Sequence, residues 1–184
     1  SAASDVYKRQ EETERHGVYI LGYPDGTFGP ARSMTRSEAA AIFARLLADK
    51  NGDTISTAAN TKFTDIPAHA WYSGYVKYLN NNGVTYGKSG NTFAPDDAIT
   101  RAEFAAIAAR FDNDGDKAAA KFSDIATHWA KDEISIAYNN GWITGYPNST
   151  FGPQRDITRA ETMTLVNRVL NRQPETEDDL LPNM

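Results

Sequence analysis

One five-residue pattern occurs three times in this chain and constrains its fold more than any other feature. The copies occupy residues 34–38, 99–103 and 157–161, and each reads apolar-Thr-Arg-(Ala/Ser)-Glu. A Thr followed three residues later by a Glu is a capping box, in which each side chain bonds the other residue's backbone N–H. Each copy precedes apolar residues at the helical spacing i, i+3, i+4, i+7, as in Phe104, Ile107, Ala108 and Phe111. We therefore expect three helices, one beginning at each box.

The arginine of the pattern has no obvious role in starting a helix. Arg36, Arg101 and Arg159 each follow the capping Thr directly, where the helix dipole disfavours a cation. A local rule broken three times at one position indicates function. An arginine beside free helix N–H groups would suit a carboxylate or a phosphate. The alternative is a solvated arginine or a structural salt bridge, and the residues alone leave both open.

A turn-rich loop precedes each box at a constant distance. In every copy a glycine is followed six residues later by a phenylalanine and eight residues after that by the arginine. The glycines are Gly22, Gly87 and Gly145, and the phenylalanines are Phe28, Phe93 and Phe151. This fixed spacing indicates tandem repeats. We expect the phenylalanines to pin the loops to the core.

The second and third repeats share a further segment upstream of the loop. It contains Asp65 and Trp71 in one copy and Asp124 and Trp129 in the other, followed by an apolar helical pattern that ends at Asn-Gly. The first repeat lacks this Asp and this Trp. We therefore divide the chain into repeats at 18–50, 60–112 and 120–172. Residues 1–17 are expected to be irregular or non-native, and residues 173–184 to form an acidic tail.

Composition narrows the classes of function. A net charge of −5 without a basic face argues against nucleic acid, and the absence of cysteine excludes disulfides and thiolate metal sites. No apolar run approaches the length of a membrane span, and the first thirty residues lack the apolar region of a signal peptide. The chain is thus expected to be either cytosolic or a piece of a longer exported protein.

Catalysis and metal binding find little support in the sequence. The three histidines, His16, His69 and His128, are scattered and show no catalytic or metal-ligand spacing, so we expect no enzyme. Residues 112–116 are acidic, but they lack the glycine and glutamate positions of a calcium-binding loop. We therefore expect no metal site.

Together, these motifs resemble S-layer homology repeats, the cell-wall anchoring modules of bacterial surface proteins. The resemblance is carried by Phe122-Ser123-Asp124, by His128-Trp129-Ala130, by the Gly145 loop and by the 157–161 box, and it covers about residues 18–172. It implies an all-α fold of three tandem helix-loop-helix repeats in a pseudo-threefold arrangement. The first helices would form a central bundle, and the loops and second helices would form prongs.

The same resemblance implies a function at the cell surface, as part of a longer exported protein. The ligand would be a secondary cell-wall polymer, often carrying pyruvylated N-acetylmannosamine, or another polysaccharide linked to peptidoglycan. It would be bound non-covalently, without a cofactor and without catalysis, in grooves between neighbouring repeats. The competing hypothesis is a protein–protein or self-assembly module of a surface layer that binds no glycan.

By resemblance, ligand binding falls to the motif arginine, the aspartate, the tryptophan and the loop glycine of the repeats. These are Arg36, Arg101, Arg159, Asp65, Asp124, Trp71, Trp129, Gly22, Gly87 and Gly145. The chemistry agrees, because a pyruvyl carboxylate suits a bidentate arginine, a sugar face suits tryptophan, and sugar hydroxyls need a carboxylate acceptor. Lys88, which replaces the loop tyrosine in the second repeat, could add a second cation.

Structural alternatives remain for several of these residues. The tryptophans could belong to the core, and the aspartates could cap the following turn. Only the second and third repeats combine Asp, Trp and Arg. The most complete groove is therefore expected where these two repeats meet.

Overall fold

The computed structural model describes residues 19–20, 22–23, 25–112 and 115–172. Its helices are α2 (Arg36–Asn51), α3 (Ser73–Asn81), α4 (Arg101–Asp112), α5 (Lys131–Asn139) and α6 (Arg159–Val169). This part of the chain contains isolated β-bridges but no β-strand, which confirms the predicted all-α class. The segments predicted at 1–17 and 173–184 lie outside the described residues.

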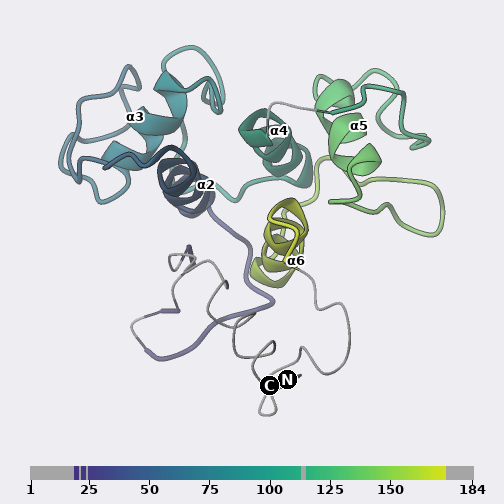
Figure 1. The fold of residues 1–184 in the computed structure, drawn as a ribbon, viewed down its shortest axis with the longest axis horizontal. Helices are drawn as coiled ribbons and strands as arrows, with labels where there is room; N and C mark the ends of the chain where they lie inside the picture. The colour runs from purple at the N-terminus through teal and green to yellow at the C-terminus, as the bar shows by residue number, and fades with distance from the viewer. Residues whose placement is uncertain (1–18, 21, 24, 113–114, 173–184) are drawn as a thin grey trace, which may run out of the picture.

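The three helices that follow the boxes, α2, α4 and α6, lie at the centre, while α3 and α5 lie outside them (Figure 1). The expectation that the first helix of each repeat forms the central bundle is therefore wrong. The reason is that the helices differ in how many of their side chains are buried. In α4 the buried residues run almost without interruption from Ala102 to Ala109, whereas α3 buries few residues beyond Val76 and Leu79. A helix that is apolar all round belongs in the middle of a fold.

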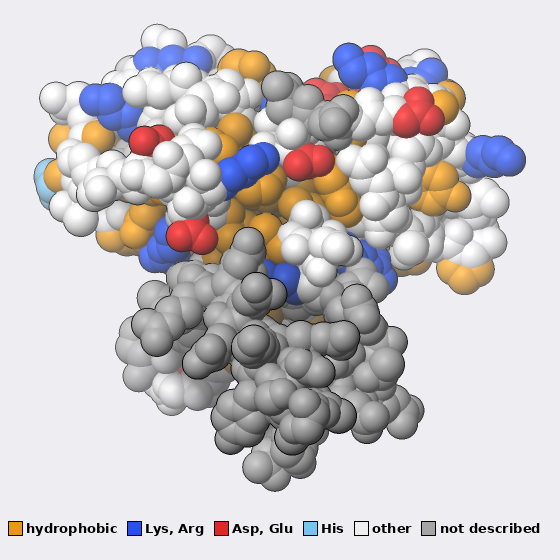
Figure 2. Space-filling model, viewed as in Figure 1, with side chains coloured by type: hydrophobic (Ala, Val, Ile, Leu, Met, Phe, Trp, Pro, Cys, Tyr) orange, Lys and Arg blue, Asp and Glu red, His pale blue; other side chains and the backbone are white. Residues whose placement is uncertain are grey.

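Each outer helix packs on the central helix that precedes it in the sequence, α3 on α2 and α5 on α4. The two helices of one sequence repeat thus do not pack on each other, because the first of them lies against the second helix of the preceding repeat. On the face seen in Figure 2, hydrophobic side chains gather between the two outer lobes. Aromatic contacts fill this centre, with Phe43 lying 5.2 Å from Phe104 and 5.6 Å from Phe111 between ring centroids.

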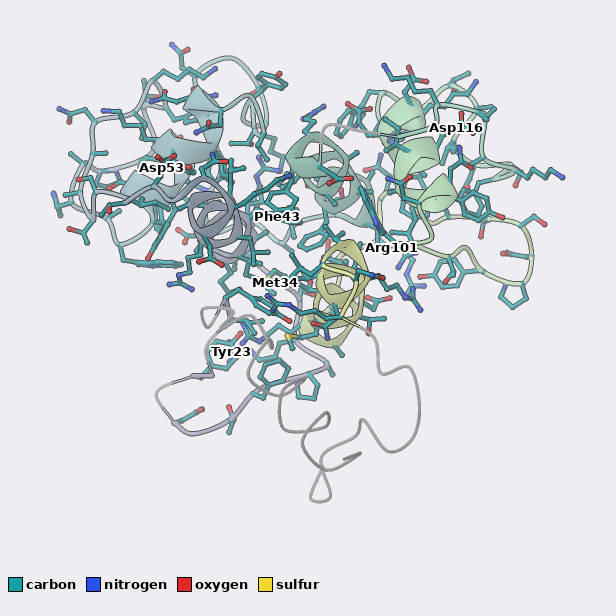
Figure 3. All side chains as sticks on the ribbon, viewed as in Figure 1. Tyr23, Met34, Phe43, Asp53, Arg101 and Asp116 are labelled. Atoms are coloured by element: carbon teal, nitrogen blue, oxygen red, sulfur yellow. The ribbon has the colours of Figure 1, made fainter. Side chains whose placement is uncertain are left out.

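Three backbone hydrogen bonds close a ring just before the central helices. The N–H of Met34 donates to the carbonyl of Ile157 at 3.0 Å, Ile157 donates to Ile99 at 3.1 Å, and Ile99 donates back to Met34 at 2.9 Å. All three side chains are buried, and Figure 3 places Met34 at the meeting point of the central helices. This closed exchange between equivalent residues confirms the predicted pseudo-threefold arrangement.

The capping boxes form as predicted, but the helix N–H groups beside the arginines are already bonded. Thr35 with Glu38 and Thr158 with Glu161 make both bonds of the box, and Thr100 with Glu103 makes the same pair. The next two N–H groups of every central helix donate to carbonyls of a neighbouring repeat's loop. The bonds are Arg36 to Asp97, Ser37 to Pro95, Arg101 to Arg155, Ala102 to Pro153, Arg159 to Arg32 and Ala160 to Pro30. The expected free N–H groups at these positions are therefore absent.

The loop phenylalanines differ between repeats. Phe93 and Phe151 are buried as expected. The ring centroid of Phe63 lies 5.4 Å from that of Phe93, and the ring centroid of Phe122 lies 5.6 Å from that of Phe151. Phe28 is 37% exposed, so the expected core anchor is wrong for the first repeat. That repeat lacks the upstream Phe-x-Asp segment that covers the other two loops.

Candidate functional site

The motif arginines form ion pairs from one repeat to the next. Each guanidinium contacts the capping glutamate of the following repeat, and the third repeat contacts the first. The pairs are Arg36–Glu103 at 2.7 Å, Arg101–Glu161 at 3.2 Å and Arg159–Glu38 at 3.3 Å. The central helices are therefore joined by a closed ring of three ion pairs.

The same arginines also hold the loop of that following repeat. Their Nε groups donate to the carbonyls of Phe93, Phe151 and Phe28, at 2.7, 3.0 and 2.9 Å respectively. Arg36 and Arg159 are only 4% and 2% exposed. Burial lowers the pKa of Arg36 although Glu103 opposes the shift, and a guanidinium stays charged at neutral pH all the same. These residues therefore form the structural salt bridges that the sequence left open as one alternative.

The two aspartates hold the loops from the other side. Asp65 accepts hydrogen bonds from the N–H groups of Phe93 and Ala94, at 2.9 and 2.6 Å. Asp124 accepts from Phe151 and Gly152, both at 2.8 Å. The alternative that they cap the turn directly after them is wrong, because these partners lie 27 to 29 residues downstream.

The loop glycines allow close contact with an aromatic ring. A Cβ on Gly145 would lie 2.2 Å from the ring of Phe122, and one on Gly87 would lie 2.5 Å from the ring of Phe63. At Gly22 the nearest atom, a backbone oxygen, would be 3.2 Å away. A side chain is thus excluded at Gly87 and at Gly145, while the position of Gly22 in the first loop has more space.

Both motif tryptophans are exposed. Trp71 is 55% exposed and Trp129 is 59% exposed, so the alternative of core tryptophans is wrong. Trp71 meets Tyr72 and Tyr75 edge-on, at 5.4 and 6.4 Å, and Trp129 lies 5.5 Å from His128. Neighbouring rings hold these indoles in place while much of their surface remains open to a ligand.

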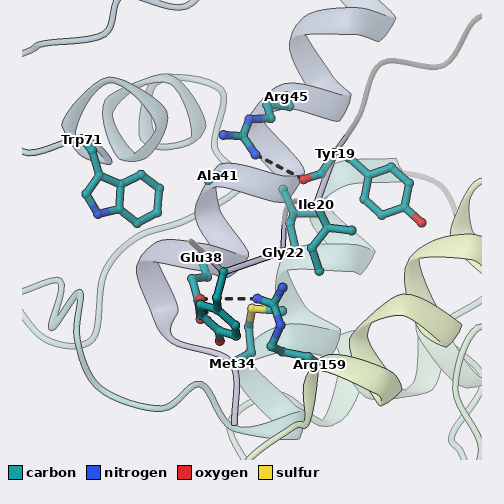
Figure 4. Close-up of a pocket in the computed structure, with 11 residues that line it drawn as sticks. Tyr19, Ile20, Gly22, Met34, Glu38, Ala41, Arg45, Trp71 and Arg159 are labelled. Atoms are coloured by element: carbon teal, nitrogen blue, oxygen red, sulfur yellow. Dashed lines mark hydrogen bonds and ion pairs between the residues drawn. The ribbon is translucent and has the colours of Figure 1, made fainter. Parts of the chain in front are cut away.

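Three grooves collect the candidate residues. The first groove, of about 210 Å³, contains Arg159 from the third repeat, Gly22 and Glu38 from the first, and Trp71 from the second. Figure 4 shows Trp71 on the opposite side of this groove from Tyr19 and Ile20, with Arg159 near Glu38. Residues from three repeats thus meet in one cavity.

The second groove likewise combines a motif arginine, a loop glycine and a motif tryptophan from three repeats, and the described lining of the third groove has only the arginine and the glycine. The second, of about 490 Å³, contains Arg36, Gly87 and Trp129, again one from each repeat. The third, of about 220 Å³, contains Arg101 and Gly145, but the motif tryptophan is missing among its described lining residues. A groove takes its tryptophan from the repeat after its loop, and the first repeat has none. The groove between Arg101 and the Gly145 loop thus lacks a motif tryptophan in its described lining. The second groove does combine the second repeat's Gly87 with the third repeat's Trp129, although its motif arginine comes from the first repeat.

Sequence reasoning missed a second arginine in each groove. Arg45, Arg110 and Arg168 line the first, second and third grooves respectively. Each lies nine residues after a motif arginine, so the repeated spacing was a usable signal. Arg110 pairs with Glu133 at 2.6 Å, and Arg168 donates to the carbonyl of Trp142 at 3.3 Å.

Lys88 lines the second groove but is already matched by an anion. It forms an ion pair with Asp97. At the equivalent positions the other two loops pair a tyrosine with an arginine, and Arg155 donates to the hydroxyl of Tyr146 at 2.6 Å. The second repeat has exchanged a tyrosine–arginine contact for a lysine–aspartate pair.

The described residues offer neither a metal site nor a membrane-spanning helix. No group of three or more His, Cys, Asp or Glu side chains there could hold a metal ion. None of the described helices combines the length and apolarity that crossing a membrane requires.

Comparison with known proteins agrees with this architecture. The family model for the S-layer homology domain matches residues 14–40, 62–105 and 121–163. The chain is 38% identical over 169 residues to a cellulosome-anchoring protein of Acetivibrio thermocellus, a match that covers 88% of the chain and 37% of that protein. It is 37% identical over 171 residues to cell surface glycoprotein 1 of the same organism, covering 86% of the chain and 7% of the relative.

A third relative is an S-layer protein of Bacillus licheniformis, 30% identical over 174 residues, with 90% of the chain and 19% of the relative covered. The chain thus spans little more than a third of the length of the first relative and less of the others. The family and these relatives place the chain at the cell surface. Three matches in tandem, together with the closed threefold core, show that the chain belongs to the S-layer homology domain family.

Proposed function

We propose that this chain anchors a longer surface protein to the cell wall by binding an anionic secondary cell-wall polysaccharide, with pyruvylated N-acetylmannosamine as the recognised sugar. Binding is non-covalent and involves no catalysis. The names of the relatives support the anchoring part of this proposal, since they include a cellulosome-anchoring protein and an S-layer protein.

The observation that carries the proposal is the combination of charge and aromatic surface in the first two grooves. Arg159 and Arg45 line the first groove together with the exposed Trp71. Arg36 and Arg110 line the second together with the exposed Trp129. A carboxylate on a sugar needs a cationic site beside a flat apolar surface, and both grooves offer this pair.

The two arginines of a groove have different parts in this proposal. The motif arginine is largely buried and bonded within the ring, so it contributes positive charge at the floor and fixes the shape of the groove. The second arginine is more accessible, with 25% of the Arg110 side chain exposed, so it is the better donor to a ligand carboxylate. The aspartates and loop glycines act through the loop that forms the wall.

The test is calorimetric titration with purified wall polymer, before and after chemical removal of ketal-linked pyruvate. We expect binding to the intact polymer and a loss of at least about tenfold after pyruvate removal, the equivalent of one charge-assisted contact. Equal binding of both preparations would refute recognition of pyruvate. Self-association without polymer binding would instead support the self-assembly hypothesis.

Variants should avoid the buried ring, because its loss is expected to destabilise the fold and so to confuse the measurement of binding. Trp129→Ala removes an exposed ring. Burying about 80 Å² of indole against a sugar contributes about 2 kcal/mol, so second-groove affinity should fall about thirtyfold. Arg110→Gln should weaken binding of the intact polymer only. The matched control is Lys121→Gln, an exposed cation that lines none of the three grooves.

A further inference from the structure

The first groove does not end at Arg45. A neighbouring cavity of about 390 Å³ shares Tyr19 and Arg45 with it and continues along α2 to Asp49 and Asp53. We name the part at Arg159 and Glu38 the inner chamber, and the part at Asp49 and Asp53 the outer chamber. The outer chamber lies between the C-terminal half of α2 and Tyr75 of α3.

The third groove repeats this division. A cavity of about 450 Å³ shares Trp142 and Arg168 with it, and its other lining residues include Asp112 and Asn140. Arg168 is the equivalent of Arg45, nine residues after its motif arginine. In two grooves, therefore, the second arginine stands at the boundary between an inner and an outer chamber.

The two chambers of the first groove differ in charge. The inner chamber has Arg159 and Arg45 against one carboxylate, Glu38. The outer chamber has Asp49 and Asp53 against Arg45 alone. A negatively charged group is attracted to the inner chamber and repelled by the outer one.

The outer chamber presents groups that bind hydroxyls. Asp53 accepts a hydrogen bond from the hydroxyl of Tyr78 at 2.6 Å, and its side chain is exposed. Thr54 adds a hydroxyl, and Tyr75 adds an aromatic ring whose oxygen accepts a bond from Arg45 at 3.3 Å. Carboxylates, a hydroxyl and a ring are the groups that recognise a neutral, hydroxyl-rich molecule.

We propose that the first groove binds two consecutive sugar residues, with the anionic residue in the inner chamber and a residue without negative charge in the outer chamber. This inference rests on the proposed function and adds a direction to it. Arg45 contacts both residues, since its guanidinium bonds the carbonyl of Tyr19 and the hydroxyl of Tyr75 and lines both cavities. The grooves then read a sequence of sugars and not a single charged group.

Nuclear magnetic resonance on the whole chain separates the chambers. The probes are a methyl glycoside of pyruvylated N-acetylmannosamine and a disaccharide that joins the same residue to N-acetylglucosamine. Both probes should shift the backbone N–H signals of Gly22 and Glu38, and only the disaccharide should shift those of Asp53 and Thr54. Identical shifts with the two probes would overturn the inference and leave the proposed function standing. Failure of both probes to bind would count against the proposed function itself.

A double variant gives the matching affinity measurement. Asp49→Ala with Asp53→Asn changes two exposed side chains of the outer chamber. First-groove affinity for the disaccharide, followed through the Gly22 signal, should fall about tenfold, and that for the monosaccharide should stay within about twofold. Asp132→Ala, which removes an exposed carboxylate from α5, should change neither. A double variant that binds the disaccharide as tightly as the parent would overturn the inference.

Discussion

Arg159, the first residue of α6, is ion-paired with Glu38 in the first turn of α2, across 121 residues of sequence. The pair closes the ring that Arg36–Glu103 and Arg101–Glu161 begin. The guanidinium also donates to the carbonyl of Phe28. One side chain thereby joins the end of the described fold to its beginning.

Removing that guanidinium should destabilise the protein strongly. Arg159→Ala leaves Glu38 without its cation and the Phe28 carbonyl without its donor, so the free energy of unfolding should fall by about 2–4 kcal/mol. Arg159→Lys keeps the charge but loses the Nε bond, and should cost less. Urea denaturation measures both. Lys121→Ala, at an exposed lysine, is the control and should change stability by less than about 0.5 kcal/mol.

Loss of a cap should be measurable separately from loss of the ring. Thr158→Ala removes the oxygen that accepts from the N–H of Glu161, so we expect a loss of about 0.5–2 kcal/mol. Thr164→Ala is the control, because Thr164 is exposed in the middle of α6 and only bonds back to the carbonyl of Ala160. Equal thermal midpoints for the two variants would show that the box adds no stability.

The loop glycines should differ in their tolerance of a methyl group. Gly145→Ala would place its Cβ 2.2 Å from the Phe122 ring and 2.8 Å from the Thr150 oxygen, so about 1–3 kcal/mol should be lost by overpacking. Gly22→Ala meets its nearest atom at 3.2 Å and should cost less. If Gly22→Ala proved the more damaging in urea titrations, the close contact at Gly145 would not be what requires glycine.

Acid should weaken the third loop through Asp124. Burial raises the pKa of this carboxyl, but hydrogen bonds from the N–H groups of Phe151 and Gly152 outweigh it and lower the pKa below its ordinary value. A depressed folded-state pKa stabilises the fold above the unfolded pKa of about 3.9, and this contribution is lost as the pH falls through the folded-state pKa. Thermal midpoints from pH 6 downward should therefore fall less steeply for Asp124→Asn than for the parent. Parallel curves would contradict this assignment.

A single repeat should not fold alone. In residues 118–172, α5 would lose α4, and the N–H groups of Arg159 and Ala160 would lose the carbonyls of Arg32 and Pro30. Circular dichroism of this fragment should show little helix. A cooperative melt at the midpoint of the whole chain would contradict the prediction.

Local features were the ones that the sequence predicted well. The box of Thr158 and Glu161 depends on residues three apart, so its spacing alone predicts the helix start. The fixed step from Gly145 to Phe151 predicted a repeated loop for the same reason. The positions of α3 and α5 outside the centre were harder to predict. They depend on comparing how much of each helix's circumference is buried, and a repeated motif does not report that difference.

Side-chain contacts between repeats could not be predicted from local sequence patterns. Nothing near Arg159 indicates that Glu38 is its partner, because ring closure alone brings the two together. The same closure brings Trp71 and Arg159 into one groove and leaves the described lining of the third groove without an equivalent tryptophan. Arg45 was missed for a different reason. Its spacing of nine residues from Arg36 is repeated. An arginine late in a helix, however, agrees with the helix dipole, so its position did not suggest a function.

The backbone ring of Met34, Ile99 and Ile157 fixes how many repeats this architecture can have. In an open solenoid each repeat touches only its neighbours, so repeats can be gained or lost one at a time. Here each member donates to one partner and accepts from the other, so a deletion would leave one donor and one acceptor unmatched. A two-repeat descendant would have to find new partners for both groups, and the geometry of the closed ring would be lost. Change in this lineage should therefore proceed by divergence of residues within three repeats, as Lys88 and Asp97 illustrate, and not by alteration of their number.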